Sequence, residues 1–225
     1  NCEDKNRVNN KIPLSFYHIE DTVYNLNSFD DFNSFMVENP ILSEAFFETN
    51  NSIKKKEELF SLINNIYFDS LYFEVNNTFK SFNSKKKEFE DSFSRLKAIL
   101  PQVNIPKITT IVSGFYNDVV VVDNNIIIGL DYFLDNDSRF KPQDIPDYIL
   151  KRYSPDNLVP ITMSVYCSQF NKTNPLDNTM ISEMLNFGKL YYLLETILPC
   201  VSPYNLIGYS QEEWTPINQN EETIY

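Results

Sequence analysis

The sequence predicts an α+β protein that is mainly helical and contains a small three-stranded sheet with a hairpin. Apolar residues recur at helical spacing through the first hundred residues, β-branched runs follow between residues 107 and 130, and helical spacing returns after Pro146. Because the strands are grouped and do not alternate with helices, the pattern differs from that of a doubly wound α/β fold.

The region from residue 12 to residue 105 is expected to be helical. Ser28 is a typical N-cap residue, and Phe29, Phe32 and Met36 follow it on one face of a helix. Similar spacing predicts further helices over residues 40–46, 57–66, 70–82 and 84–100.

The sheet is expected within residues 106–131. Apolar and β-branched residues fill the segments 107–113, 118–122 and 126–130. The last two segments flank Asp123-Asn124-Asn125, whose short polar side chains tolerate positive φ, so they form the predicted hairpin. The runs are continuously apolar, which predicts a sheet covered on both faces.

Residues 132–225 are expected to be helical again. Helices are predicted over 147–153, 155–170 and 177–199, and residues 203–208 are expected to form a short turn or helix. Ser210 and Glu213 have the spacing of a capping box, and Asn220 can cap a last segment.

The segment 177–199 is the longest predicted helix and is apolar on more than one face, so we expect it to be buried. Gly188 and Lys189 lie in its middle, and neither is there for helix stability. A buried lysine needs a carboxylate partner, for which Asp131 and Glu221 are the candidates. The alternative is that the Lys189 side chain reaches solvent along its aliphatic stem.

Composition excludes several classes of function. A net charge of −12 argues against binding to a nucleic-acid backbone. The longest apolar run, 190–194, is far shorter than the roughly 20 residues that span a bilayer, so no transmembrane helix is predicted. His18 is the only histidine, which argues against catalytic triads and two-histidine zinc sites. The four glycines are widely separated and cannot form a phosphate-binding loop, so no cofactor is expected.

The three cysteines are too few and too scattered for a disulfide framework. Cys2 is followed by a polar segment through residue 11 that has no apolar pattern to fold it. A mature bacterial lipoprotein begins in this way, with an acylated cysteine and a flexible tether. The alternative is an ordinary cysteine that lies near the start of the chain.

Several dispersed motifs carry a family resemblance. They are residues 126–134 (IIIGLDYFL), 145–148 (IPDY), 179–195 (TMISEMLNFGKLYYLLE), 198–199 (LP), 207–209 (IGY) and 213–214 (EW). In these motifs the chain resembles the gliding-motility-associated lipoprotein GldB family of Bacteroidetes, over roughly residues 12–225.

The resemblance implies a lipoprotein of the cell envelope. It implies removal of a signal peptide before Cys2, acylation of Cys2, and attachment to a membrane, which we expect to be the outer membrane on its periplasmic side. Residues 1–11 would be the tether and residues 12–225 a single domain. The implied role is in gliding motility and type IX secretion, through protein partners of that machinery.

This family resembles the zincin metallopeptidases in plan, with helices, a small sheet, and then the helix that carries H-E-x-x-H. Gly188, Lys189 and Tyr192 occupy the motif positions here, so both histidine ligands and the general base are replaced. Without two imidazoles an ordinary zinc-activated water cannot form. The resemblance therefore implies a pseudo-metallopeptidase with no catalytic residues and no metal. The vestigial cleft would contain Gly188, Lys189, Tyr192, Asp131, Glu221 and Trp214.

In this cleft the Lys189 ammonium would stand where the metal lies in active members and would neutralise Asp131 or Glu221. The competing hypothesis is a hydrolase that uses carboxylates such as Asp131, Glu183 or Glu221, with or without a metal held by oxygen ligands.

Overall fold

The computed structural model describes residues 11–143, 145–171 and 179–220. Contacts between Cα atoms divide the chain into two compact units. The sheet unit comprises residues 13–87 and 104–158, and the described part of the helical unit comprises 11–12, 88–103, 159–171 and 179–220. The single domain over residues 12–225 stays a prediction.

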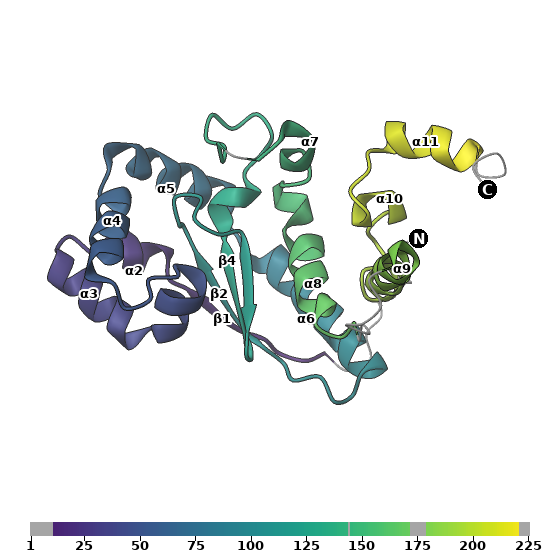
Figure 1. Cartoon of the computed structure of the whole chain (residues 1–225), viewed down its shortest axis with the longest axis horizontal. Helices are drawn as coiled ribbons and strands as arrows, with labels where there is room; N and C mark the ends of the chain where they lie inside the picture. Colours follow the sequence, from purple (N-terminus) through teal and green to yellow (C-terminus); the bar gives the residue numbers. More distant parts are fainter. Residues whose placement is uncertain (1–10, 144, 172–178, 221–225) are drawn as a thin grey trace. The chain divides into compact units, whose positions relative to one another are not determined.

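The sheet unit is built on a four-stranded mixed sheet with the order β1-β2-β4-β3 (Figure 1). Strand β2 pairs in parallel with β1 on one side and with β4 on the other, and β3 is antiparallel to β4. The strands are β1 Ser15–His18, β2 Lys107–Ile111, β3 Val119–Val122 and β4 Asn125–Gly129. The α+β class and the β3–β4 hairpin are confirmed, and Asp123 in the turn has a φ of 51°.

Strand β1 is the strand that the sequence analysis missed, so the sheet has four strands and residues 12–105 are not helical throughout. Its four residues are too few to show an alternating pattern, and the strand forms by pairing with β2, far away in the sequence. The register places Phe16 beside Ile108 and His18 beside Thr110.

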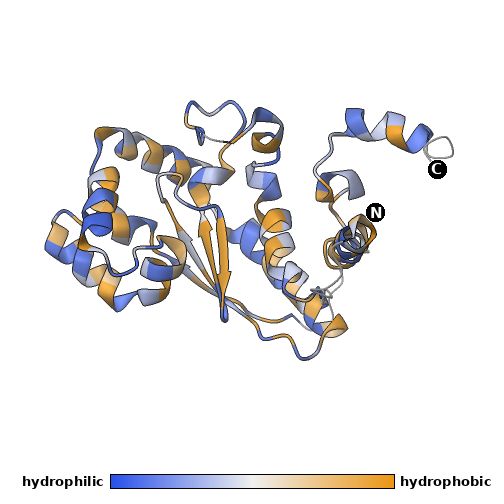
Figure 2. Cartoon of the chain, viewed as in Figure 1, coloured by the Kyte–Doolittle hydropathy of each residue, from blue (hydrophilic) through white to orange (hydrophobic). Residues whose placement is uncertain are grey.

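One face of the sheet forms the centre of the core of this unit. Ile108, Ile126 and Ile128 are completely buried, and Ile127 on the opposite face of β4 is nearly so. Strand β4 is largely hydrophobic along its ribbon in Figure 2. The central strand β4 is therefore buried on both faces, as predicted. The outer strand β1 is not, because Tyr17 is half exposed.

Capping side chains set where the helices of the sheet unit begin. Ser28 Oγ accepts a hydrogen bond from Asp31 N, as predicted. Ser52 and Asn65 cap the next two long helices in the same way, so both begin four residues before the predicted positions. These helices are α2 Glu20–Tyr24, α3 Phe29–Glu38, the π-helix η1 Leu42–Phe46, α4 Ile53–Ile63, α5 Ile66–Thr78 and the start of α6 Asn83–Ile99.

Three short helices follow the sheet within the same unit. They are the 3₁₀-helix η2 Leu130–Phe133, α7 Asp147–Leu150 and the 3₁₀-helix η3 Pro155–Asn157. Helix η2 follows β4 directly, so it carries Asp131 and Tyr132 away from the end of the central strand.

The helical unit contains most of α6 together with the helices α8 Leu158–Ser168, α9 Met180–Ile197, α10 Pro203–Leu206 and α11 Gln211–Gln219. Phe93 packs edge-on against Tyr166 with 5.0 Å between the ring centroids, and Arg95 Nη1 donates to the carbonyl of Ile197 at 3.1 Å. These contacts join α6 to α8 and to the end of α9.

Helix α11 has a capping side chain at each end. Ser210 and Glu213 form the predicted capping box at the start of α11. Asn220 is the C-cap of the same helix, where its side chain donates to the carbonyl of Pro216. The last segment that it was expected to cap lies outside the described residues.

Helix α9 is not buried along its length, which corrects the sequence-based expectation. Leu190, Leu194 and Ile197 are buried, and their spacing forms one narrow stripe near the C-terminal end. The first turns are exposed, with Met180 at 76% and Ile181 at 70%. A long apolar helix needs only one stripe to dock, and the sequence could not show which apolar residues that stripe would use. Within the described residues, no helix combines the length and apolar character needed to cross a membrane.

Candidate functional site

Asp131 is the most deeply buried carboxylate in the described structure, with 1% of its surface exposed. Its carboxylate accepts hydrogen bonds from Ser113 N at 3.1 Å and from Phe115 N at 2.5 Å. The Ser113 hydroxyl donates to the same group at 3.1 Å. Both oxygens are therefore occupied by donors from the loop that joins β2 to β3.

This loop has an unusual backbone that directs its amides at one point. Gly114 and Phe115 both have positive φ, 72° and 63°. Ser113 N and Phe115 N, on either side of Gly114, both donate to the Asp131 carboxylate, so this turn presents its amides to a negative charge. A left-handed conformation is uncommon for phenylalanine, and the hydrogen bonds to Asp131 hold it in place.

Gly129 allows the loop to approach the end of β4. A Cβ atom at this position would lie 2.2 Å from the carbonyl oxygen of Asn117, which no side chain tolerates. Asn117 also donates from its side chain to the carbonyl of Phe46, so the loop is tied to η1 on its other side. Gly129 and Asp131, two residues apart in the sequence, thus act on the same loop. Gly129 leaves room for its backbone, and Asp131 accepts hydrogen bonds from its amides.

The electrostatics of Asp131 follow from its burial. Desolvation raises the pKa of the Asp131 carboxyl, and the hydrogen bonds from Phe115 and Ser113 oppose that rise. With both oxygens engaged by donors from the loop and only 1% of its surface exposed, the Asp131 carboxylate stabilises the loop.

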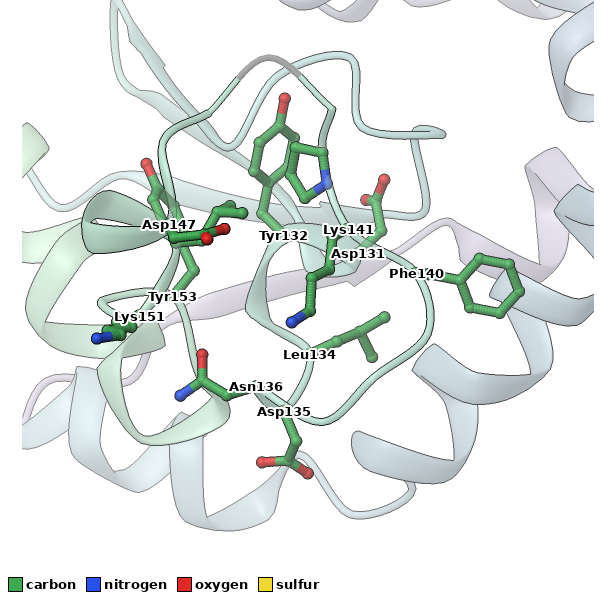
Figure 3. Close-up of a pocket in the computed structure, with 12 residues that line it drawn as sticks. Asp131, Tyr132, Leu134, Asp135, Asn136, Phe140, Lys141, Asp147, Lys151 and Tyr153 are labelled. Carbon is green, nitrogen blue, oxygen red and sulfur yellow. The ribbon is translucent and has the colours of Figure 1, made fainter.

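A pocket of about 270 Å³ lies beside this buried group (Figure 3). Tyr132 and Tyr153 form part of its wall, with their ring centroids 5.8 Å apart. The other lining residues come from η2, from the segment after it, and from α7 and its C-cap: Asp131, Leu134, Asp135, Asn136, Phe140, Lys141, Pro142, Asp147, Leu150 and Lys151.

Both tyrosine hydroxyls donate within the protein. Tyr132 Oη donates to the carbonyl of Phe115 at 2.7 Å, and Tyr153 Oη donates to Asp118 Oδ2 at 2.5 Å. Burial, and then the negative charges of Asp131 and Asp118, raise the pKa of Tyr132 to about 12. Burial and the hydrogen bond to Asp118 raise the pKa of Tyr153. The two rings in the pocket wall are therefore neutral, and their hydroxyl protons are already donated to acceptors within the protein.

The sequence analysis did not identify this pocket, although two of the motifs that carry the family resemblance border it. Tyr132 and Leu134 belong to the motif 126–134, and Asp147 belongs to the motif 145–148. The separation of the two motifs in the sequence gave no sign that they meet in space.

The residues predicted for the vestigial cleft fall in both units. Asp131 lies in the sheet unit, and the others that the structure describes lie in the helical unit. Lys189 and Tyr192 are exposed on α9, and Trp214 on α11 is half-buried. Gly188 is also exposed, and a Cβ atom there would meet nothing within 4 Å. The alternative in which Lys189 reaches solvent thus describes its position, and the cleft itself stays a prediction.

The remaining candidate residues have the following places. Glu183 is exposed in the first turn of α9, and His18 Nδ1 lies 2.8 Å from the hydroxyl of Thr110 on the neighbouring strand. Cys2 and Glu221 lie outside the described residues. In the segments that the structure describes, no three His, Cys, Asp or Glu side chains are grouped as metal ligands.

Comparison with protein families yields one assignment. A family model described as gliding motility protein GldB matches residues 1–225, which is the whole chain. Comparisons with curated proteins and with solved structures gave no match. On the strength of the full-length match, the chain belongs to the family of the gliding motility protein GldB.

Proposed function

We propose that this chain is a non-catalytic, lipid-anchored protein of the cell envelope that binds protein partners in the gliding and type IX secretion machinery. Membership of the GldB family implies a role in gliding motility. The binding role, the lipid anchor and a place on the periplasmic side of the outer membrane are the proposal.

The exposed apolar surface of α9 carries this proposal. Six large apolar side chains on this helix are between 57% and 76% exposed: Met180, Ile181, Met184, Leu185, Phe187 and Tyr192. Contiguous apolar surface of this kind marks protein or membrane contact sites on folded proteins. Methionine and aromatic side chains are also enriched at the centres of protein interfaces.

The first described residues support a short tether. Lys11 Nζ lies 3.1 Å from Asp91 Oδ1, and Ile12 N donates to Ser94 Oγ at 2.9 Å, so the chain is held against α6 from this point. Residues 3–11 span at most about 30 Å when fully extended. An acyl group on Cys2 would therefore keep this end of α6 within about that distance of the membrane.

The pseudo-peptidase part of the proposal rests on the order of elements and on side-chain chemistry. After strand β1, the helices α2–α6, the remaining strands with their hairpin, and a later helix with residues 188–192 follow one another, and this order supports the resemblance to the zincin plan. Gly188 has no ligand atom at the first motif position, and Tyr192 is a poor zinc ligand near neutral pH. The saturated carboxylate of Asp131 argues against a hydrolase that would use it as a base or nucleophile.

Complementation of a gliding strain that lacks its own copy tests the proposal. A chain with Ile181→Asp and Leu185→Asp is expected to abolish colony spreading, because two charges interrupt the apolar face. A matched chain with Asp30→Asn and Glu57→Gln, which changes exposed charges on α3 and α4, is expected to spread normally. Normal spreading by the first chain, at equal protein level and with an unchanged circular dichroism spectrum, would overturn the binding role of α9.

A further inference from the structure

The pocket beside Tyr132 has an apolar wall and a rim that carries both signs of charge. We propose that it binds a short peptide with free amino and carboxyl ends, of roughly dipeptide size, through Lys141 and Asp147. This inference concerns the sheet unit alone and does not rest on the proposed role of α9 or on the lipid anchor.

The inner wall can hold an apolar side chain. Leu134 is buried at the base, Leu150 is half-buried on α7, and the two tyrosine rings complete the wall. Since the hydroxyls of Tyr132 and Tyr153 donate to Phe115 and Asp118, the rings offer carbon surface and no free hydroxyl proton. A hydrophobic group placed here would be removed from water at no cost in hydrogen bonds.

The rim supplies the charges. Lys141 and Lys151 lie around the pocket with Asp135 and Asp147, and the buried Asp131 carboxylate lies in the wall. Among the described residues none of the four rim side chains has an oppositely charged partner within 4.0 Å. Figure 3 shows the Lys141 ammonium and the Asp147 carboxylate pointing inward from different segments, and the Asp135 carboxylate pointing away. One cationic and one anionic group are thus open to a ligand.

The balance of charge selects the ligand class. A simple anion would be attracted by Lys141 but repelled by Asp147. A simple cation would be attracted by Asp147 but repelled by Lys141. A ligand with a carboxylate and an ammonium satisfies both, and its apolar side chain fits the tyrosine wall. A volume of about 270 Å³ is close to the lower end of small-molecule pockets, which points to one or two amino acid residues.

Calorimetric titration of the purified full chain with four probes tests this proposal. The probes are the dipeptide Leu-Phe, its N-acetyl form, its C-terminal amide, and the form blocked at both ends. We expect saturable binding of free Leu-Phe and a loss of about fivefold in affinity for each blocked end, since a partly exposed ion pair contributes about 1 kcal/mol.

Two variants locate the contacts. Amidation of the dipeptide is expected to cause no further loss of affinity for Lys141→Gln, because the ligand carboxylate has already lost its partner. Acetylation is likewise expected to cause no further loss of affinity for Asp147→Asn, because the ligand ammonium has already lost its partner. The controls Lys107→Gln and Glu57→Gln change exposed charges outside the pocket and are expected to behave like the wild type. All four changed side chains are exposed, so thermal unfolding should be unaltered.

The proposal is overturned if free Leu-Phe shows no saturable binding, if the four probes bind equally, or if blocking an end costs the same in the variants as in the wild type. The calorimetric titration alone decides the proposal, because it measures binding in the pocket directly, whatever the effect of Lys141→Gln on gliding.

Discussion

Asp131 Oδ2 accepts a hydrogen bond from Phe115 N, a residue whose φ of 63° places it in the left-handed region. A buried carboxylate and a strained backbone thus stabilise each other. The carboxylate has the donors that its burial requires, and the loop has an acceptor for amides that its conformation turns inward.

Removing the carboxylate should therefore destabilise the protein. Asp131→Ala leaves the amides of Ser113 and Phe115 without their acceptor, and we expect a loss of about 3 kcal/mol in the free energy of unfolding. Urea denaturation measures it. The control Asp135→Ala changes an exposed aspartate nearby and should have an effect below about 0.5 kcal/mol. Similar values for both variants would contradict the role of Asp131.

Gly129 and Gly188 form a matched pair of glycines with opposite expectations. Gly129→Ala places a Cβ atom 2.2 Å from a backbone oxygen, so we expect a loss of about 3 kcal/mol or failure to fold. Gly188→Ala adds a methyl group in open space within a helix and should stabilise by about 0.5–1 kcal/mol. Thermal and urea unfolding of both variants check the pair. A large destabilisation by Gly188→Ala would show that its surroundings are crowded.

The stability of the protein should depend on pH through Asp131. Because burial raises its pKa above the ordinary 3.8, the folded state binds this proton more tightly than the unfolded state. The stabilisation is complete below pH 3.8 and is lost as the pH rises through the folded pKa. Relative to Asp131→Asn, which does not titrate, the wild type should lose stability as the pH is raised from about 4.

Urea unfolding of both proteins at a series of pH values measures this difference. A wild-type advantage over Asp131→Asn that grows with pH would mean that the hydrogen bonds from Ser113 and Phe115 outweigh desolvation, and that the pKa is lowered.

The proposed anchor makes a separate prediction. Cells that produce the full precursor with Cys2→Ala should show no incorporation of labelled palmitate into this protein, and the protein should move from the membrane fraction to the soluble fraction. Substitution of Cys167, which is buried and free, serves as the control and should leave both labelling and membrane attachment intact. Labelling that persists without Cys2 would exclude acylation at that position.

Much of the fold could be predicted because short-range patterns encode it. Ser28 and the Ser210–Glu213 pair marked helix starts through hydrogen bonds to amides only two or three residues away. The turn at Asp123 was visible for the same reason, since it depends on the side chains of the turn itself. The family motifs could also be recognised in the sequence alone, and the family that they indicated is the one that matches the whole chain.

Other features were decided only when distant segments met. Strand β1 exists because its residues pair with β2, and the loop 113–118 keeps its left-handed residues because Asp131 reaches them from the end of β4. The apolar residues of α9 cover more than one face of the helix, and only packing selected Leu190, Leu194 and Ile197 for burial. Local sequence specifies which elements can form, because their hydrogen bonds lie within a few residues. Which surfaces they bury depends on free-energy differences between whole arrangements, and these arise only in the tertiary structure.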